Sequence, residues 1–151
     1  MTSTVPLKKR LAQVFWLGFL VASLAYAGYS FYAPPNDIAW QTDPAAAQSM
    51  AREAGKPMVY FVTATWCSPC RKMKRQVWAD DAVRDLINGD FVPVLVDADD
   101  ETSAPVLAKF GISGTPWTLF TTPEGDVFDY RAGAIPKDEF LTILDKAARK
   151  F

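Results

Sequence analysis

Histidine is absent from this chain of 151 residues. Its absence excludes serine–histidine catalytic triads, imidazole metal ligands and a histidine-based pH switch. Cysteine is scarce as well, because Cys67 and Cys70 are the only two. A structural zinc site normally needs four ligands, mostly Cys and His, so an all-cysteine site would require two copies of the chain. We therefore expect neither a metal site nor a bound cofactor.

Acidic residues are absent from residues 1–33, which carry Lys8, Lys9 and Arg10. The remainder of the chain holds 13 basic and 17 acidic side chains, a net charge of −4. It lacks the concentrated positive charge that nucleic-acid-binding proteins place on one face. The composition therefore favours proteins or small molecules as partners, and not nucleic acid.

Charge is also missing from Leu11–Ala33, a run of 23 residues. As a helix this run would be about 34 Å long, enough to cross a hydrocarbon core of about 30 Å. The basic residues before it predict that the N-terminus stays in the cytoplasm. We therefore expect residues 1–10 to be a cytoplasmic basic region and residues 11–33 to be a transmembrane signal anchor, followed by a linker over 34–42.

A cleaved signal peptide is the alternative, because Ala25-Tyr26-Ala27 resembles a signal peptidase site. Either interpretation places a domain over 43–151 beyond the membrane, in a compartment that permits disulfides. The expected location is thus the bacterial inner membrane, crossed once, with the C-terminal domain in the periplasm. If the signal is cleaved, the protein would be a soluble periplasmic one.

Short apolar segments alternate with amphipathic ones beyond residue 43. Asp43 and Pro44 are typical of a helix N-cap and first helical position, and Gly55 of a helix end. Strands that alternate with helices and end in an antiparallel hairpin predict an α/β fold with a mixed central sheet covered on both faces. The expected order is a helix over 44–55, a strand over 56–65, helices over 71–78 and 82–89, a strand over 91–99, a helix over 102–111, strands over 115–122 and 127–133, and a helix over 136–150.

The two cysteines stand where a buried strand passes into a helix, in the stretch FVTATWCSPCRKM. A purely structural disulfide would close a very small loop and constrain the unfolded chain little. Cys67 is expected at or beside the N-cap, where unpaired N–H groups and the helix dipole favour a thiolate. Cys70, one turn into the helix, should be less exposed. We interpret Cys67 as the attacking thiolate and Cys70 as the resolving thiol.

The motif WCSPC, followed some 45 residues later by GISGTPW, resembles the thioredoxin superfamily over roughly residues 43–150. The resemblance implies a three-layer α/β/α fold and a redox-active disulfide between the two cysteines. It implies an active-site loop that includes Trp66, Ser68 and Pro69. It also implies a cis bond between Thr115 and Pro116, with the backbone at Thr115 pairing with an incoming polypeptide.

Trp117 follows the expected cis-proline directly, where thioredoxins often have Thr. One interpretation is a core aromatic side chain of the strand, and the other is an apolar lip that contacts the partner together with Thr115 and Pro116. A second departure is Phe61, at the position where the family carries a buried acidic residue. Leu95 similarly replaces a buried lysine. The proton acceptor for Cys70 is therefore open, with Asp97, Asp99 or water as candidates.

Two longer stretches, WCSPCRKMKRQVWADDAVRDLI and TTPEGDVFDYRAG, resemble the C-terminal periplasmic domain of DsbD, the transmembrane thiol:disulfide interchange protein. The resemblance, with Pro69 before the second cysteine and no histidine in the loop, favours an enzyme that reduces protein disulfides. Oxidised periplasmic proteins would be its substrates and a membrane thiol carrier of the DsbD type its electron donor. A thiol oxidase or isomerase, and a non-catalytic binding or assembly module on the same fold, are the alternatives.

Overall fold

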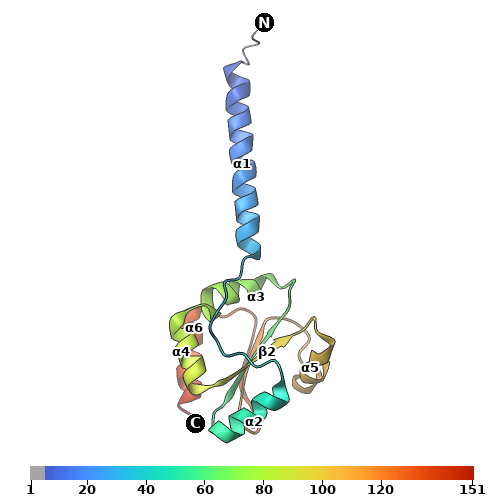
Figure 1. Ribbon diagram of the computed structural model, residues 1–151, viewed down its shortest axis with the longest axis vertical. Helices are drawn as coiled ribbons and strands as arrows, with labels where there is room; N and C mark the ends of the chain where they lie inside the picture. Colours follow the sequence, from blue (N-terminus) through green and yellow to red (C-terminus); the bar gives the residue numbers. More distant parts are fainter. Residues whose placement is uncertain (1–5) are drawn as a thin grey trace. The chain divides into compact units, whose positions relative to one another are not determined.

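The computed structural model describes residues 6–151, which divide into two compact units between Tyr32 and Ala33. Helix α1 (Leu7–Phe31) makes up the first unit, and none of its residues is buried (Figure 1). Within the described chain it is the one helix that is long and apolar enough to cross a membrane. It begins four residues before the span expected from the sequence and ends two residues before that span's end.

The second unit is built on a four-stranded mixed sheet with the strand order β2-β1-β3-β4. The two central strands, β1 and β3, are antiparallel to each other, whereas β2 runs parallel to β1 and β4 antiparallel to β3. The mixed sheet with a terminal antiparallel hairpin confirms the prediction from the sequence. The strands are β1 (Met58–Thr63), β2 (Val92–Asp97), β3 (Trp117–Thr121) and β4 (Val127–Ala132).

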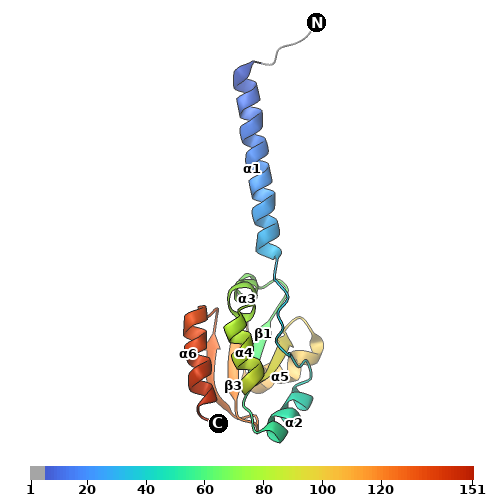
Figure 2. The ribbon, with the colours of Figure 1, turned by 60° about the vertical axis from the view of Figure 1, so that its left-hand side comes forward.

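Helices cover both faces of this sheet. The side chains of one core cluster come from α3, η1, α4 and α6, and those of the other from α2 and α5, which gives three layers. Figure 2 shows α4 and α6 together on one side of the strands and α2 and α5 on the other. The segments are α2 (Pro44–Ala54), α3 (Ser68–Met73), the π-helix η1 (Lys74–Trp78), α4 (Asp81–Asp90), the 3₁₀-helix η2 (Glu101–Ser103), α5 (Ala104–Phe110) and α6 (Lys137–Ala148).

Strand β1 lies at the centre and is buried along its whole length, as its nearly continuous apolar run predicts. Phe61 on one face packs against Trp78, with ring centroids 4.8 Å apart. Trp78 in turn contacts Phe140 of α6. The end of β1 leads directly into the two cysteines, so this rigid strand fixes where they stand.

The segment over 34–42, which we expected to be a linker, packs against the second unit. Ile38 is buried and Trp40 lies 5.0 Å from Trp78, centroid to centroid. The backbone of Gln41 pairs with β2: its N–H donates to the carbonyl of Pro93 and its own carbonyl accepts from Leu95. The apolar contacts and the backbone hydrogen bonds order the segment. The backbone pairing at Gln41 also covers part of the outer edge of β2, which would otherwise be open.

Helix ends follow the sequence signals in most places. The Asp43 carboxylate accepts from the N–H of Ala45 at the start of α2, and Gly55 ends that helix with φ of 64°. Asp80 caps α4 in the same way as Asp43 caps α2. The expected stop at Gly89 is wrong, because α4 continues through Asp90.

Candidate functional site

Cys67 and Cys70 are joined by a disulfide, with 5.2 Å between their Cα atoms. Cys67 is the N-cap of α3, and its Sγ accepts a hydrogen bond from the N–H of Cys70 at 3.1 Å. Pro69 occupies the first turn, where no backbone N–H is needed. Both sulfurs are buried in this oxidised form, so exposure does not distinguish them. The distinction is the backbone N–H, which is placed to stabilise negative charge on Cys67.

The loop before the cysteines is fastened by one carboxylate. Asp99 accepts hydrogen bonds from Thr65 N (2.7 Å), Thr65 Oγ1 (2.6 Å) and Trp66 Nε1 (2.9 Å). From the other side, Arg71 donates to the Thr65 carbonyl at 2.8 Å. The bonds from Thr65, followed by that from Trp66, lower the pKa of Asp99. A carboxylate held in this way is a poor proton acceptor, so we assign Asp99 to holding the loop.

Trp66, Ser68 and Pro69 surround the disulfide on its outer side. All three are exposed, and Trp66 exposes 66% of its surface although its indole nitrogen is bonded to Asp99. A large apolar ring held rigidly beside a buried disulfide is suited to contact with another molecule. The sequence prediction that these residues form the loop around the cysteines thus agrees with their position, whereas their part in binding stays a prediction.

The parallel strands β1 and β2 present two pairs of side chains to the same face of the sheet. Phe61 lies beside Leu95, and two residues further along Thr63 lies beside Asp97. The first pair is wholly apolar and occupies the positions of the family's buried acid and lysine. The second pair is polar: Asp97 Oδ1 accepts from the N–H of Asp99 at 3.0 Å. The polar group nearest the carboxyl ends of these strands is therefore Thr63–Asp97 and not residue 61.

The bond between Thr115 and Pro116 is cis. Strand β3 begins directly after this bond. Because Trp117 pairs with Val62, Pro116 lies beside the C-terminal end of β1, which is the end of the strand that the cysteines follow. The carbonyl of Pro116 accepts from the N–H of Gly133 at 2.8 Å. This bond ties the loop after β4 to the proline.

Trp117 lies half-buried at the start of β3. It packs against the core cluster on the α2 and α5 side, and its ring stacks on Tyr130 at 5.5 Å with 15° between the planes. Tyr130 is itself 56% exposed. Trp117 is thus part of the core at one edge and part of an exposed aromatic pair at the other, so both interpretations drawn from the sequence keep their basis.

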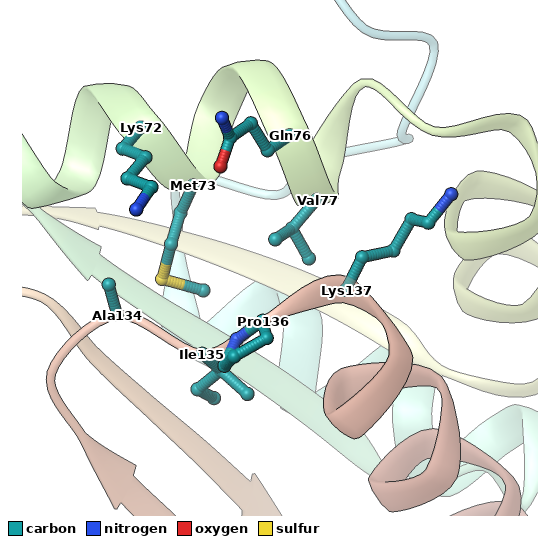
Figure 3. Close-up of a pocket in the computed structure, with 8 residues that line it drawn as sticks. All are labelled: Lys72, Met73, Gln76, Val77, Ala134, Ile135, Pro136 and Lys137. Carbon is teal, nitrogen blue, oxygen red and sulfur yellow. The ribbon is translucent and has the colours of Figure 1, made fainter.

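A cavity of about 220 Å³ lies beside the helix that carries the cysteines. Figure 3 shows Met73 of α3 reaching down toward the loop before α6, where Ile135 and Pro136 form the opposite wall. Lys137 at its rim donates to Asp80 at 2.9 Å and does not enter the cavity. The cavity lies between α3 and the loop before α6, and Gly133 at the start of that loop is hydrogen-bonded to the cis-proline.

Sequence reasoning did not find the division of labour between the two acids after β2. Asp97 and Asp99 were equal candidates, and only the hydrogen bonds of Asp99 to Thr65 and Trp66 separate them. One signal was available: the carboxyl ends of neighbouring parallel strands meet at one edge of a sheet. Acids at the end of β2 and directly after it are therefore expected to lie near the residues that follow β1.

Comparison with curated proteins finds partial relatives. The chain is 32% identical over 78 residues to the thiol:disulfide interchange protein DsbD of Yersinia pestis and 34% identical over 100 residues to DsbD 1 of Pseudomonas aeruginosa. These matches cover 51% and 62% of this chain but only 13% and 17% of the relatives. The chain is also 28% identical to the chloroplastic thioredoxin-like protein HCF164 of Oryza sativa, over 89% of its own length and 49% of that protein.

Solved structures with the same fold include a thioredoxin from Thermus thermophilus, with a TM-score of 0.67 and 24% identity over 75% of this chain and 88% of the other. The oxidised C-terminal domain of DsbD from Neisseria meningitidis matches with a TM-score of 0.60 and 22% identity, over 72% and 99%. These likenesses confirm the predicted thioredoxin-like fold. A family model described as a thioredoxin-like domain matches residues 44–148. The chain therefore belongs to the thioredoxin-like family.

Proposed function

We propose that this chain is a membrane-anchored periplasmic thiol:disulfide oxidoreductase that reduces disulfides in other proteins. The observation that carries the proposal is the Cys67–Cys70 disulfide at the start of a helix, with the N–H of Cys70 directed at Cys67 Sγ. A sulfur at an N-cap with a bonded N–H is stabilised as a thiolate after reduction. That asymmetry gives the two cysteines different roles.

In the reduced protein, the Cys67 thiolate attacks one sulfur of a client disulfide. The client S–S bond breaks, a mixed disulfide forms at Cys67, and the second client sulfur leaves as a thiolate that takes up a proton. Cys70 then loses its proton, attacks Cys67 Sγ and restores the intramolecular disulfide. The client leaves with both sulfurs reduced, and the pair Cys67–Cys70 has given up two electrons.

Client chains are proposed to bind beside the cis-proline. The backbone of Thr115 precedes β3 at the edge of the sheet where the cysteines follow β1, so an extended segment paired there would present its disulfide to Cys67. Apolar surface for the client would come from Trp66, which is exposed beside Cys67, and from Trp117, which directly follows the cis-proline. Specificity in this arrangement comes from side chains next to the client disulfide, since backbone pairing is independent of sequence.

The proposed direction is reduction, with a membrane thiol carrier of the DsbD type as electron donor. Pro69 before the second cysteine and the lack of histidine in the loop favour a reducing pair. The partial identity to DsbD supports a donor of this type. A single-pass anchor at α1 would raise the local concentration of the domain near such a donor.

Two measurements on the full chain in detergent test the proposal. Wild type is expected to reduce the disulfides of insulin, whereas Cys67→Ser is inactive and Cys70→Ser accumulates mixed disulfides. The redox potential, measured by equilibrium with glutathione, is expected near the roughly −270 mV of thioredoxin.

A potential near the roughly −120 mV of DsbA would contradict the reductase and favour a thiol oxidase. Equal insulin reduction by wild type and Cys67→Ser would instead leave a binding module as the function. Trapping with Cys70→Ser in the native membrane would identify the clients and the electron donor, because the mixed disulfide at Cys67 is no longer resolved.

A further inference from the structure

The resolving cysteine stands on the helix face that also carries Lys74. Cys70 is buried against the sheet, and the N–H of Lys74 bonds back to the Cys70 carbonyl, which is α-helical spacing. Residues four apart on a helix have their Cβ atoms about 5–6 Å apart. Lys74 is half-buried, so its stem runs along the protein and does not extend freely into solvent.

The opposite charge for Lys74 comes from the sheet. Asp97 at the end of β2 acts on Lys74 electrostatically, and the partial burial of Lys74 lowers the pKa of its amine against that attraction. The register pairs Asp97 with Thr63 on the face that carries Phe61, which is the face covered by α3 and η1. Lys74 on η1 and Asp97 on β2 therefore interact on the side of the sheet where Cys70 is buried.

A buried hydroxyl completes this cluster. Thr63 exposes 2% of its surface, and its Oγ1 makes no hydrogen bond with any of residues 6–151. A buried donor without a partner is costly, so a polar group that gains charge nearby would be favoured there. Cys70 gains a charge when it loses its proton. The face of the sheet on which Cys70 is buried thus carries one partly buried cation, one anion and one buried hydroxyl without a hydrogen-bond partner among residues 6–151.

We propose that Lys74 is the positioning residue of the resolving step: its ammonium group stabilises the thiolate of Cys70, and Asp97 holds that ammonium from β2. The inference rests on the proposed function, because only a working pair needs Cys70 as a thiolate. It assigns to η1 and β2 the electrostatic control that Phe61 and Leu95 cannot supply. The proton of Cys70 goes to solvent, and its electron pair forms the bond to Cys67 Sγ.

The alternative base, Asp97 itself, fits the observations less well. One oxygen of Asp97 is already bonded to the N–H of Asp99 at 3.0 Å, and the negative charge of its carboxylate acts on Lys74. A nearby cation, in contrast, lowers the pKa of a thiol without accepting its proton. The charged groups that act on Lys74 are Asp97 on β2 and Arg71 on α3, and the partly buried Arg75 follows Lys74 on η1.

The test measures the pKa of Cys70 in the full chain in detergent, in a Cys67→Ser background. Thiolate absorbance near 240 nm is titrated, with the protein lacking both cysteines as blank. Lys74→Met is expected to raise the pKa of Cys70 by about one, so that its thiolate fraction at pH 7 falls about tenfold. Lys74→Arg keeps the charge and is expected to stay near the parent value.

Lys72→Met is the matched control, because Lys72 is exposed and lies two residues from Cys70 on another side of the helix. It is expected to change the pKa of Cys70 little. Circular dichroism checks folding, and Lys74→Gln replaces Lys74→Met if the latter does not fold. An unchanged pKa in the Lys74 variants, or an equal change in Lys72→Met, would overturn the inference.

The same variants with both cysteines present give a second readout. Mixed disulfides at Cys67 are expected to resolve about tenfold more slowly at pH 7 in Lys74→Met, and the rate is expected to recover at higher pH. The titration needs no client and no electron donor. If insulin reduction fails in wild type while Lys74 still controls the pKa of Cys70, the proposed function is wrong and the electrostatic effect of Lys74 on Cys70 stands by itself. If wild type reduces insulin but the Lys74 variants leave the pKa of Cys70 unchanged, the proposed function stands and the inference is wrong.

Discussion

Two aspartates two positions apart at the end of β2 have different roles because their interactions differ. Asp99 binds the loop through Thr65 and Trp66, whereas Asp97 pairs with Thr63 across the strands and acts on Lys74. The sequence predicted the redox pair and the N-cap position of Cys67 from the strand-to-helix position and the motif, whereas the attacking and resolving roles stay predictions. It did not assign the acids, since a side chain's hydrogen bonds depend on the loop conformation and not on its spacing from Cys67.

Asp99→Asn is expected to destabilise the second unit at pH 7, because the amide has one acceptor oxygen where the carboxylate has two. At least one of the three hydrogen bonds from Thr65 and Trp66 is then lost, and the remaining bonds lose their charge. The pKa of Asp99 is lowered in the folded chain, so its stabilising effect is present above the unfolded pKa of about 3.9 and is lost as the pH falls through the folded value. The difference between wild type and Asp99→Asn in thermal midpoint should therefore shrink below about pH 4. Asp126→Asn, in the exposed turn between β3 and β4, is the control. A difference that stayed constant down to pH 2 would contradict the charged clamp.

Helices and strands were predicted well where capping signals and apolar runs agree. The N-cap at Asp43 and the buried strand β1 are examples. The replacement of an acid by Phe61 was visible in the sequence, but the aromatic cluster that receives it was not. Trp40 of the expected linker and Trp78 of η1 enclose Phe61 from distant parts of the chain. Periodicity within a segment carries no information on such contacts.

Replacing two glycines near helix ends by alanine is expected to change the free energy of unfolding in opposite directions. Gly111 ends α5 with φ of 65°, whereas Gly89 lies inside α4 and has no positive φ. A methyl group added at either position meets nothing within 4 Å, so only the backbone preference decides. Gly111→Ala is expected to cost about 1–2 kcal/mol of unfolding free energy, because a left-handed conformation is unfavourable for alanine. Gly89→Ala is expected to add about 0.5 kcal/mol through helix propensity.

Urea unfolding of the full chain in detergent, followed by tryptophan fluorescence, measures both changes. The two variants share the same substitution, so composition effects on the unfolded state largely cancel between them. If both variants lost stability equally, α4 would end before Gly89, as the sequence alone suggested.

For the whole molecule, the fold and the family follow from the second unit, whereas the proposed location is a prediction from the first. Helix α1 has the length and apolar character of a membrane span. Lys8, Lys9 and Arg10 lie at its N-terminal end, directly before the uncharged run that starts at Leu11. Composition alone leaves an anchor and a cleaved signal in competition, because the site at Ala25-Tyr26-Ala27 lies within the helix and a helical segment serves either purpose. The choice decides whether the redox pair is held beside a membrane donor or diffuses.

We expect the anchor, since the uncharged run continues for six residues beyond Ala27. The full chain should remain in the membrane pellet after alkaline carbonate extraction, and mass spectrometry should find residues 11–27 in the mature protein. A phosphatase reporter that is active only outside the cytoplasm should be active when fused after Phe151 and inactive when fused after Arg10. Replacing Lys8, Lys9 and Arg10 with Gln should weaken this orientation, and Lys146→Gln, in α6 of the second unit, should not. A mature chain that begins at Gly28 would contradict the anchor while leaving the cysteines in the same compartment, so the measured redox chemistry would stand unchanged.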